Sequence, residues 1–231
     1  MFDPDADAPP VNPLPPVVIV LALVMGVVEL VFQLGEAGII GGPQAIGWRG
    51  SIASTFGFSN NVAIWMWETG HFPPEHLMRF VTYPFIHVSF GDALFSIIFV
   101  LALGKFVGER VSSLVFVLVF FGSGIIAALA NTVFFGTQGA LLGADASTYG
   151  LIGAYTWILF GRLQNEGEDA FQAFRLIGSL AVLHVIFYFI FGGNDWLARA
   201  SGFVGGFAIS TILRPKEAAG ISYLLERLRK R

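Results

Sequence analysis

The sequence lacks cysteine and is poor in charged residues. None of its 231 residues is a cysteine, which excludes disulfide bonds and thiolate chemistry. Only 13% of the residues are charged whereas 55% are hydrophobic, so the chain has too little polar surface for a water-soluble globule. The start of the chain also lacks the basic region of a secretory signal and is acidic and rich in proline. We therefore expect a disordered tail over residues 1–16.

What the chain does have is long apolar runs. A bilayer core of about 30 Å requires about 20 mostly apolar residues in a helix. Six segments meet this requirement, namely 17–34, 90–106, 114–134, 145–163, 174–191 and 198–213. The sequence therefore predicts an all-α, multi-pass integral membrane protein, with six transmembrane helices forming one domain over residues 17–213.

Lysine and arginine are distributed unevenly between the connections. If the N-terminus is cytoplasmic, ten of the thirteen basic residues lie on the cytoplasmic side, and only Arg49, Arg79 and Arg199 lie on the other. This bias follows the positive-inside rule. We therefore expect both termini to be cytoplasmic and the long first loop, over 35–84, to be external. The basic, amphipathic tail over 214–231 is expected on the cytoplasmic side, either on anionic membrane lipids or in solvent.

Four stretches place polar residues in and between these segments. They are Trp48-Arg49, residues 87–96, residues 143–154 with Asp145, and residues 198–207 with Arg199. In order and spacing they resemble motifs of the rhomboid family of intramembrane serine proteases. Residues 143–154 are similar to its Gly-X-Ser-Gly motif, 198–207 to its Ala-His-X-Gly-Gly-Phe-X-X-Gly motif, and 87–96 to its His-X-X-X-X-His-Leu-Leu-Phe-Asn motif. The resemblance covers residues 45–213 and implies the six-helix rhomboid bundle, in the bacterial inner (plasma) membrane.

The same resemblance shows that the catalytic residues are replaced. Asp145 stands at the position of the nucleophilic serine, and Arg199 stands at that of the general-base histidine. Asp92 and Ser96 occupy two positions that the family uses around the oxyanion, where only His87 is retained. Arginine stays protonated at physiological pH and cannot act as a base. We therefore expect no catalytic residue at these positions and predict a pseudoprotease.

A relocated active site is the alternative to this prediction. Ser147 lies two residues beyond Asp145, which is about 200° around a helix, so it is expected to face away from the family's site. His184 lies in the fifth segment, outside the helices that carry the family's catalytic pair. The alternative is therefore an active serine-type endopeptidase with an unconventional site.

Asp145 and Arg199 have two interpretations, and both stay open at the level of sequence. They form either a structural salt bridge between the fourth and sixth segments or, with Asp92 and His87, a polar pocket that binds a polar group. Glu29 in the first segment is either functional or an anchor beside Arg49. The expected binding residues are Trp48, Arg49, Asp92, Asp145 and Arg199.

The function predicted from these features is non-catalytic binding of transmembrane helices of partner or client proteins. An active protease and a transporter are the competing hypotheses, and the chain shows no paired broken-helix repeats of the kind found in transporters. We expect no cofactor and no nucleic-acid partner. We also expect no metal site, because prolines interrupt the spacing of His71, Glu75 and His76.

Overall fold

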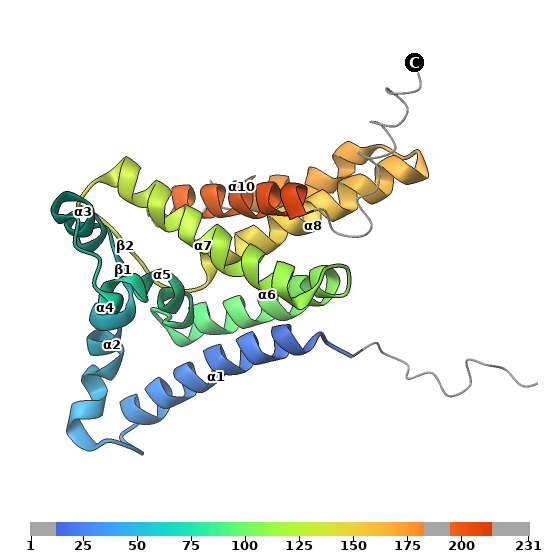
Figure 1. The fold of residues 1–231 in the computed structure, drawn as a ribbon. Coiled ribbons are helices and arrows are strands. Elements are labelled where there is room, and N and C mark those ends of the chain that lie inside the picture. The colour runs from blue at the N-terminus through green and yellow to red at the C-terminus, as the bar shows by residue number, and fades with distance from the viewer. Residues whose placement is uncertain (1–12, 183–194, 214–231) are drawn as a thin grey trace, which may run out of the picture.

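The structure, a computed structural model, describes residues 13–182 and 195–213. Five long helices form a bundle: α1 (Pro16–Glu36), α6 (Phe90–Gly108), α7 (Ser113–Phe135), α8 (Asp145–Glu166) and α10 (Trp196–Leu213) (Figure 1). Their bounds lie within three residues of five of the six segments expected from the sequence. In the sixth, 174–191, residues 175–182 are helical and follow the 3₁₀ helix η3 (Ala170–Phe174), while the remainder lies outside the described residues. The expected tails, apart from residues 13–16, also lie outside them.

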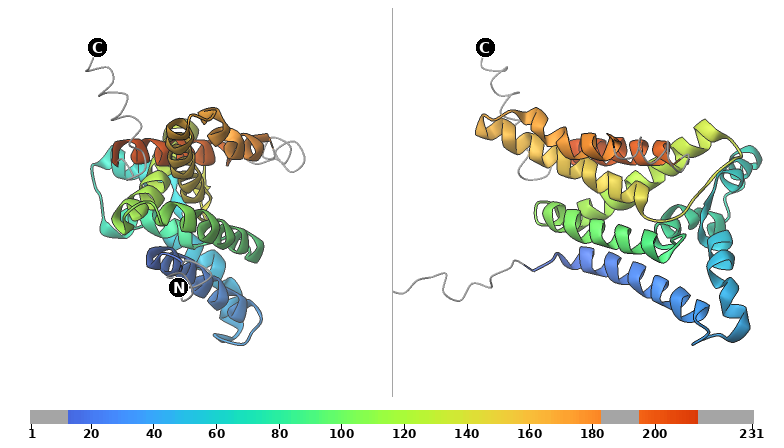
Figure 2. Two further views of the ribbon diagram at one scale, coloured as in Figure 1. Left: turned by 90° about the vertical axis from the view of Figure 1, so that its right-hand side faces the viewer. Right: turned by 180° about the vertical axis from the view of Figure 1, so that it is seen from behind.

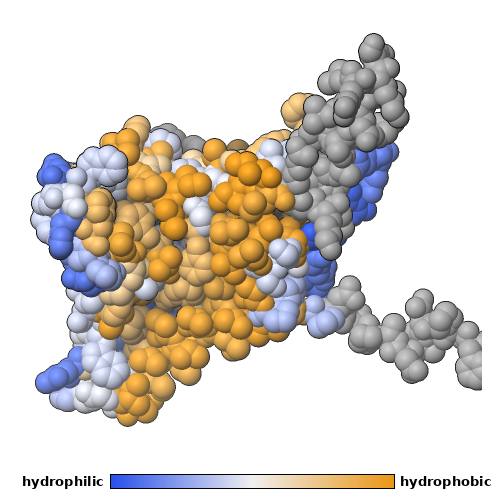
Figure 3. Space-filling model, in the orientation of Figure 1, coloured by the Kyte–Doolittle hydropathy of each residue, from blue (hydrophilic) through white to orange (hydrophobic). Residues whose placement is uncertain are grey.

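Four of the described helices, α1, α6, α7 and α10, are long and apolar enough to cross a membrane. On the face of the bundle drawn in Figure 3, hydrophobic residues cover the middle and hydrophilic residues gather at the two ends. Leu23, Val27 and Phe95 are among the large apolar side chains that these helices leave exposed. Such a band requires an apolar surrounding, because water would not solvate it.

The helix α8 has the length of a span but is less apolar than the other long helices. It packs against α6, α7 and α10, and most of its residues from Ala146 to Ile158 are buried. A helix enclosed by other helices does not face lipid, so its sequence can carry glycine, serine and threonine in place of large apolar residues. Its central position explains why its hydropathy differs from that of its neighbours.

Glycine allows α8 and α10 to approach each other closely. A Cβ atom on Gly206 would overlap the backbone of Gly150, and a Cβ on Gly202 would overlap the carbonyl group of Ala146. Gly202 and Gly206 belong to the small-residue face of α10. This face, which recurs every four residues at Ala198, Gly202, Gly206 and Ser210, is buried along its length. The α8–α10 junction is therefore backbone packed on backbone.

The long first loop is folded into short elements at one end of the bundle (Figure 2). In chain order these are η1 (Gly42–Gly47), α2 (Trp48–Phe56), β1 (Phe58–Ser59), α3 (Asn60–Thr69), α4 (Pro74–Leu77), α5 (Arg79–Thr82) and η2 (Tyr83–Phe85). The strand β1 pairs antiparallel with β2 (Ala140–Leu141), which lies between α7 and α8.

Two buried asparagines fix this loop to the end of α7. The side-chain nitrogen of Asn60 donates to the carbonyl oxygens of Asn131 (3.2 Å) and Gln138 (2.9 Å), and that of Asn131 donates to Asn60 Oδ1 (3.0 Å). Buried amides paired in this way satisfy each other and order the loop. The loop thereby brings η2 and the residues that follow it to the N-terminal ends of α6 and α8.

Candidate functional site

The N-terminal ends of three helices meet beside the folded loop. Asp92 lies in the first turn of α6 and Asp145 in the first turn of α8, while Arg199 lies near the start of α10. A carboxylate in the first turn of a helix is stabilised by the helix dipole. Ser89 caps α6, because its hydroxyl oxygen accepts a hydrogen bond from the backbone N–H of Asp92 (3.3 Å). Two carboxylates and one guanidinium thus lie at the same end of the bundle.

Asp145 and Arg199 form an ion pair across α8 and α10. Arg199 Nε donates to Asp145 Oδ2 at 2.8 Å, and Nη2 donates to the same oxygen. Asp195 Oδ2 lies 4.0 Å from Nη2. The side chain of Asp145 is 39% exposed and that of Arg199 is 23% exposed. The ion pair is therefore formed, but it is partly exposed, and the guanidinium contacts only one of the two carboxylate oxygens.

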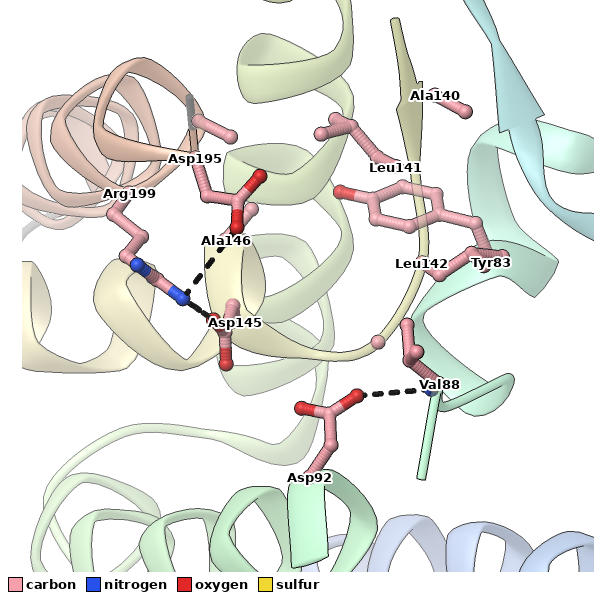
Figure 4. A pocket seen from close by; sticks show the side chains of 12 residues that line it. Tyr83, Val88, Asp92, Ala140, Leu141, Leu142, Asp145, Ala146, Asp195 and Arg199 are labelled. Carbon is pink, nitrogen blue, oxygen red and sulfur yellow. Dashed lines mark hydrogen bonds and ion pairs between the residues drawn. The ribbon is translucent and has the colours of Figure 1, made fainter. Parts of the chain in front are cut away.

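A cavity of about 260 Å³ lies beside this ion pair (Figure 4). Its charged wall consists of Asp92, Asp145, Asp195 and Arg199, and its other walls are formed by Tyr83, Val88, residues 140–143, Ala146 and Ala198. The salt bridge of the first interpretation is present and borders this pocket, whereas binding of a polar group there stays a prediction. Among the described residues, no three His, Asp or Glu side chains come together in a way that could hold a metal ion.

His87 and Ser96 do not line the cavity. His87 is 1% exposed, and neither of its ring nitrogens has a hydrogen-bond partner among the described residues. Burial lowers the pKa of His87 below its ordinary value, so the ring is neutral at neutral pH. The hydroxyl of Ser96 is likewise buried without a partner in that part of the chain.

Tyr83 is a cavity residue that the sequence did not indicate. Its ring is buried, and its hydroxyl donates to the carbonyl oxygen of Gly124 in α7 (2.9 Å). Burial raises the pKa of Tyr83, so it remains a neutral phenol. Only its place four residues before His87 could have suggested it.

No serine and histidine are paired in the part of the chain that the structure describes. Ser147 is fully buried and its hydroxyl faces Gly124 on α7, away from the cavity, as its helical position predicts. The hydroxyl of Ser201 donates to the carbonyl oxygens of Leu197 (2.6 Å) and Ala198 (3.3 Å). His184 lies outside the described residues.

Arg49 belongs to a second charged site, away from the cavity. Its Nη1 and Nη2 each donate to one oxygen of Glu29 at 2.9 Å, and its Nε donates to Glu36 Oε1 at 2.8 Å. The hydrogen bonds with Glu29 raise the pKa of Arg49. Nη1 also donates to the carbonyl oxygen of His87 (2.9 Å), and Gln33 donates to Glu29 (2.8 Å). This network ties α2 to α1.

Trp48 supports the same junction. Its ring lies against Gly35 at the end of α1 and against Gly41, where an added Cβ would overlap the indole. Neither Trp48 nor Arg49 lines the cavity. Of the five expected binding residues, the structure brings together Asp92, Asp145 and Arg199, and it places Trp48 and Arg49 in a structural anchor.

Comparison with known proteins adds a family to this geometry. A family model described as the rhomboid domain matches residues 74–216. A relative described as "Putative rhomboid protease YdcA", from Bacillus subtilis (strain 168), is 25% identical over 139 residues, which cover 60% of this chain and 68% of the relative. The matched range contains the four cavity charges and His87, whereas α1 and the Arg49 anchor lie before it.

Proposed function

The chain belongs to the rhomboid family, and we propose that it is a member without peptidase activity that binds transmembrane segments of partner proteins. The observation that carries this proposal is the Asp145–Arg199 ion pair. By the resemblance of residues 143–154 and 198–207 to the family's motifs, these two residues stand at the positions of the nucleophile and the base. Arginine cannot take a proton, and the guanidinium holds the oxygen of Asp145 that would otherwise attack. Removing either member of a catalytic pair lowers the rate by several orders of magnitude, and here both are replaced.

The proposed arrangement in the membrane has six spans with both termini cytoplasmic, in a bacterial inner (plasma) membrane. It is supported by the four apolar helices, by the length and enclosure of α8, and by the ten-to-three distribution of basic residues. In this orientation the folded first loop and the N-termini of α6, α8 and α10 lie at the external side. The cavity therefore opens at the external boundary of the bilayer.

Binding of a partner's transmembrane segment follows from two features of the surface. The face of the bundle shown in Figure 3 is apolar and can pack against another helix within the bilayer. The polar cavity lies at the end of the same bundle, where a polar group of that helix would otherwise have few partners. A scaffold that keeps both features after losing its catalytic pair suits retention of a partner better than its cleavage.

The competing function is peptide hydrolysis, which the description of the Bacillus subtilis relative favours. A fluorophosphonate probe, which labels activated serines, separates the two. We expect no labelling of the purified protein in detergent, alongside strong labelling of an active rhomboid protease as positive control. Labelling that is lost in Ser147→Ala would identify a relocated nucleophile and would overturn the proposal.

Partner binding is tested by site-specific photo-crosslinking in membranes. A photoreactive residue at Leu142, on the cavity wall, is expected to capture single-span membrane proteins. The matched control carries the same residue at Glu168, which is exposed at the opposite end of α8 and is not expected to capture them. Equal capture at both positions, or none at Leu142, would contradict binding at the cavity.

A further inference from the structure

The cavity carries more acidic than basic groups. Asp92, Asp145 and Asp195 line it together with a single guanidinium, that of Arg199. We propose that it receives the ammonium or guanidinium group of a basic residue at the external end of a partner's transmembrane segment. This inference rests on the partner binding proposed above and names the chemistry that the partner presents.

Two carboxylate oxygens are available for such a group. Arg199 holds only Oδ2 of Asp145, and Oδ2 of Asp92 accepts the backbone N–H of Val88 (3.1 Å). Within residues 13–182 and 195–213, the other oxygen of each carboxylate accepts no hydrogen bond. In Figure 4, Asp145 lies between the Arg199 guanidinium and the Asp92 carboxylate. A cation placed between the two acids would accordingly donate charge-assisted hydrogen bonds to carboxylates on both helices α6 and α8.

The ring of His87 lies next to this part of the cavity wall. A Cβ on Gly143, a cavity-lining residue, would lie 3.2 Å from Asp92 Oδ2 and 3.3 Å from Cδ2 of the His87 ring. The ring edge and the carboxylate thus meet against the same glycine. Because the buried ring is neutral, it adds no positive charge that would oppose a cation held by Asp92.

The size and walls of the cavity favour a side chain over a free small molecule. Its volume of about 260 Å³ lies below the ~300–1,000 Å³ that is typical of small-molecule sites. Val88, Leu142 and Ala198 offer apolar walls for the methylene stem of lysine or arginine, whose charged head then reaches the acids. A basic residue next to an apolar segment also matches the position of the cavity at the end of the bundle.

The test uses the full chain in phosphatidylcholine nanodiscs and two synthetic single-span peptides. Both peptides have the same leucine–alanine core, and they carry either lysine or glutamine at the external boundary. Affinity is measured by energy transfer between labelled partners. We expect the lysine peptide to bind about tenfold more tightly, because the cavity supplies unpaired carboxylate oxygens. The double variant Asp92→Asn with Asp195→Asn is expected to bind both peptides equally, whereas Glu68→Gln, exposed on α3, keeps the preference.

Each other outcome overturns a distinct statement. Equal binding of both peptides by the unsubstituted protein would overturn the preference for a basic residue and leave partner binding intact. Failure to bind either peptide would overturn partner binding and this inference with it. Loss of the preference when phosphatidylethanolamine replaces phosphatidylcholine would assign the cavity to a lipid amine. Unfolding curves of the variants, recorded in parallel, show that each one is folded.

Discussion

Two arginine–carboxylate pairs of the molecule, Arg49–Glu29 and Arg199–Asp145, differ in geometry and surroundings. Arg49 binds both carboxylate oxygens of Glu29 in a bidentate contact, and the side chains of Arg49 and Glu29 are 15% and 5% exposed. Arg199 places two nitrogens on one oxygen of Asp145, and the exposures there are 23% and 39%. The first pair joins α1 to α2 and does not line the cavity described above. The second pair forms part of a cavity wall.

The difference lies in what holds the helices together at each junction. At α1 and α2 the charges themselves make the junction, because Arg49 also binds Glu36 and the carbonyl of His87. At α8 and α10, backbone packing at the glycines makes the junction, and the ion pair lies at its open end. An ion pair that is not needed for packing can keep free acceptors, which is what a binding site requires.

The largest effect is expected at the first pair. Arg49→Ala leaves the carboxylate of Glu29 buried and unpaired, so we expect the free energy of unfolding to fall by about 3–5 kcal/mol. Arg49→Lys is expected to lower the free energy of unfolding by less than Arg49→Ala does, because the lysine ammonium keeps the charge but cannot form the bidentate contact with Glu29. Reversible unfolding in mixed detergent measures the change. Arg162→Ala, which breaks an exposed pair with Glu166, serves as control, and we expect it to lower the free energy of unfolding by about 0.5 kcal/mol or less. An equal loss of stability in Arg49→Ala and Arg162→Ala would contradict the contrast between buried and exposed pairs.

The second effect tests the claim that glycine packing holds α10 against α8. Gly206→Ala places a methyl group on the backbone of Gly150, so the two helices must separate. We expect a loss of about 1–3 kcal/mol in the same unfolding assay. Gly178→Ala is the matched control, since nothing lies within 4 Å of a Cβ added there. A Gly206→Ala variant as stable as the control would mean that the ion pair, and not the glycine packing, holds α10 against α8.

These two junctions also show what sequence could and could not predict. The positions of α1, α6, α7 and α10 follow from apolar runs, and the Asp145–Arg199 pairing follows from two complementary substitutions. The exposure of that pair could not be predicted, because it depends on where the chain between β2 and α8 passes. The place of Tyr83 in the cavity wall could not be predicted either. Its partner is a backbone carbonyl of α7, and no residue pattern encodes such a contact.

The third effect concerns His87, which lies between the two pairs. Arg49 holds its carbonyl oxygen, and its ring lies near Asp92 and, at longer range, Glu29 and Asp145. Because burial lowers its pKa in the folded state, the unfolded chain binds a proton first as the pH falls. Stability is therefore retained above the ordinary pKa of about 6.5 and decreases below it. Between pH 7.5 and 5.5 we expect a loss of at most about 1.4 kcal/mol, which His87→Gln abolishes. A variant with unchanged pH dependence would assign the titration to the carboxylates.

The smallest effect is expected at the second pair. Water reaches Asp145, so neither Asp145→Ala nor Arg199→Ala strands a fully buried charge. Each is expected to cost about 1 kcal/mol, and the coupling between them, measured with the double variant, is expected to be within about 1 kcal/mol. Unfolding in mixed detergent at low and at high salt gives both quantities, and the coupling is expected to shrink as salt screens the open pair. A coupling of about 3 kcal/mol or more, insensitive to salt, would mean that the pair is enclosed as tightly as Glu29 and Arg49. An Asp145 carboxylate enclosed in this way would not be accessible to a bound cation, and the proposed role of the cavity in binding would be overturned.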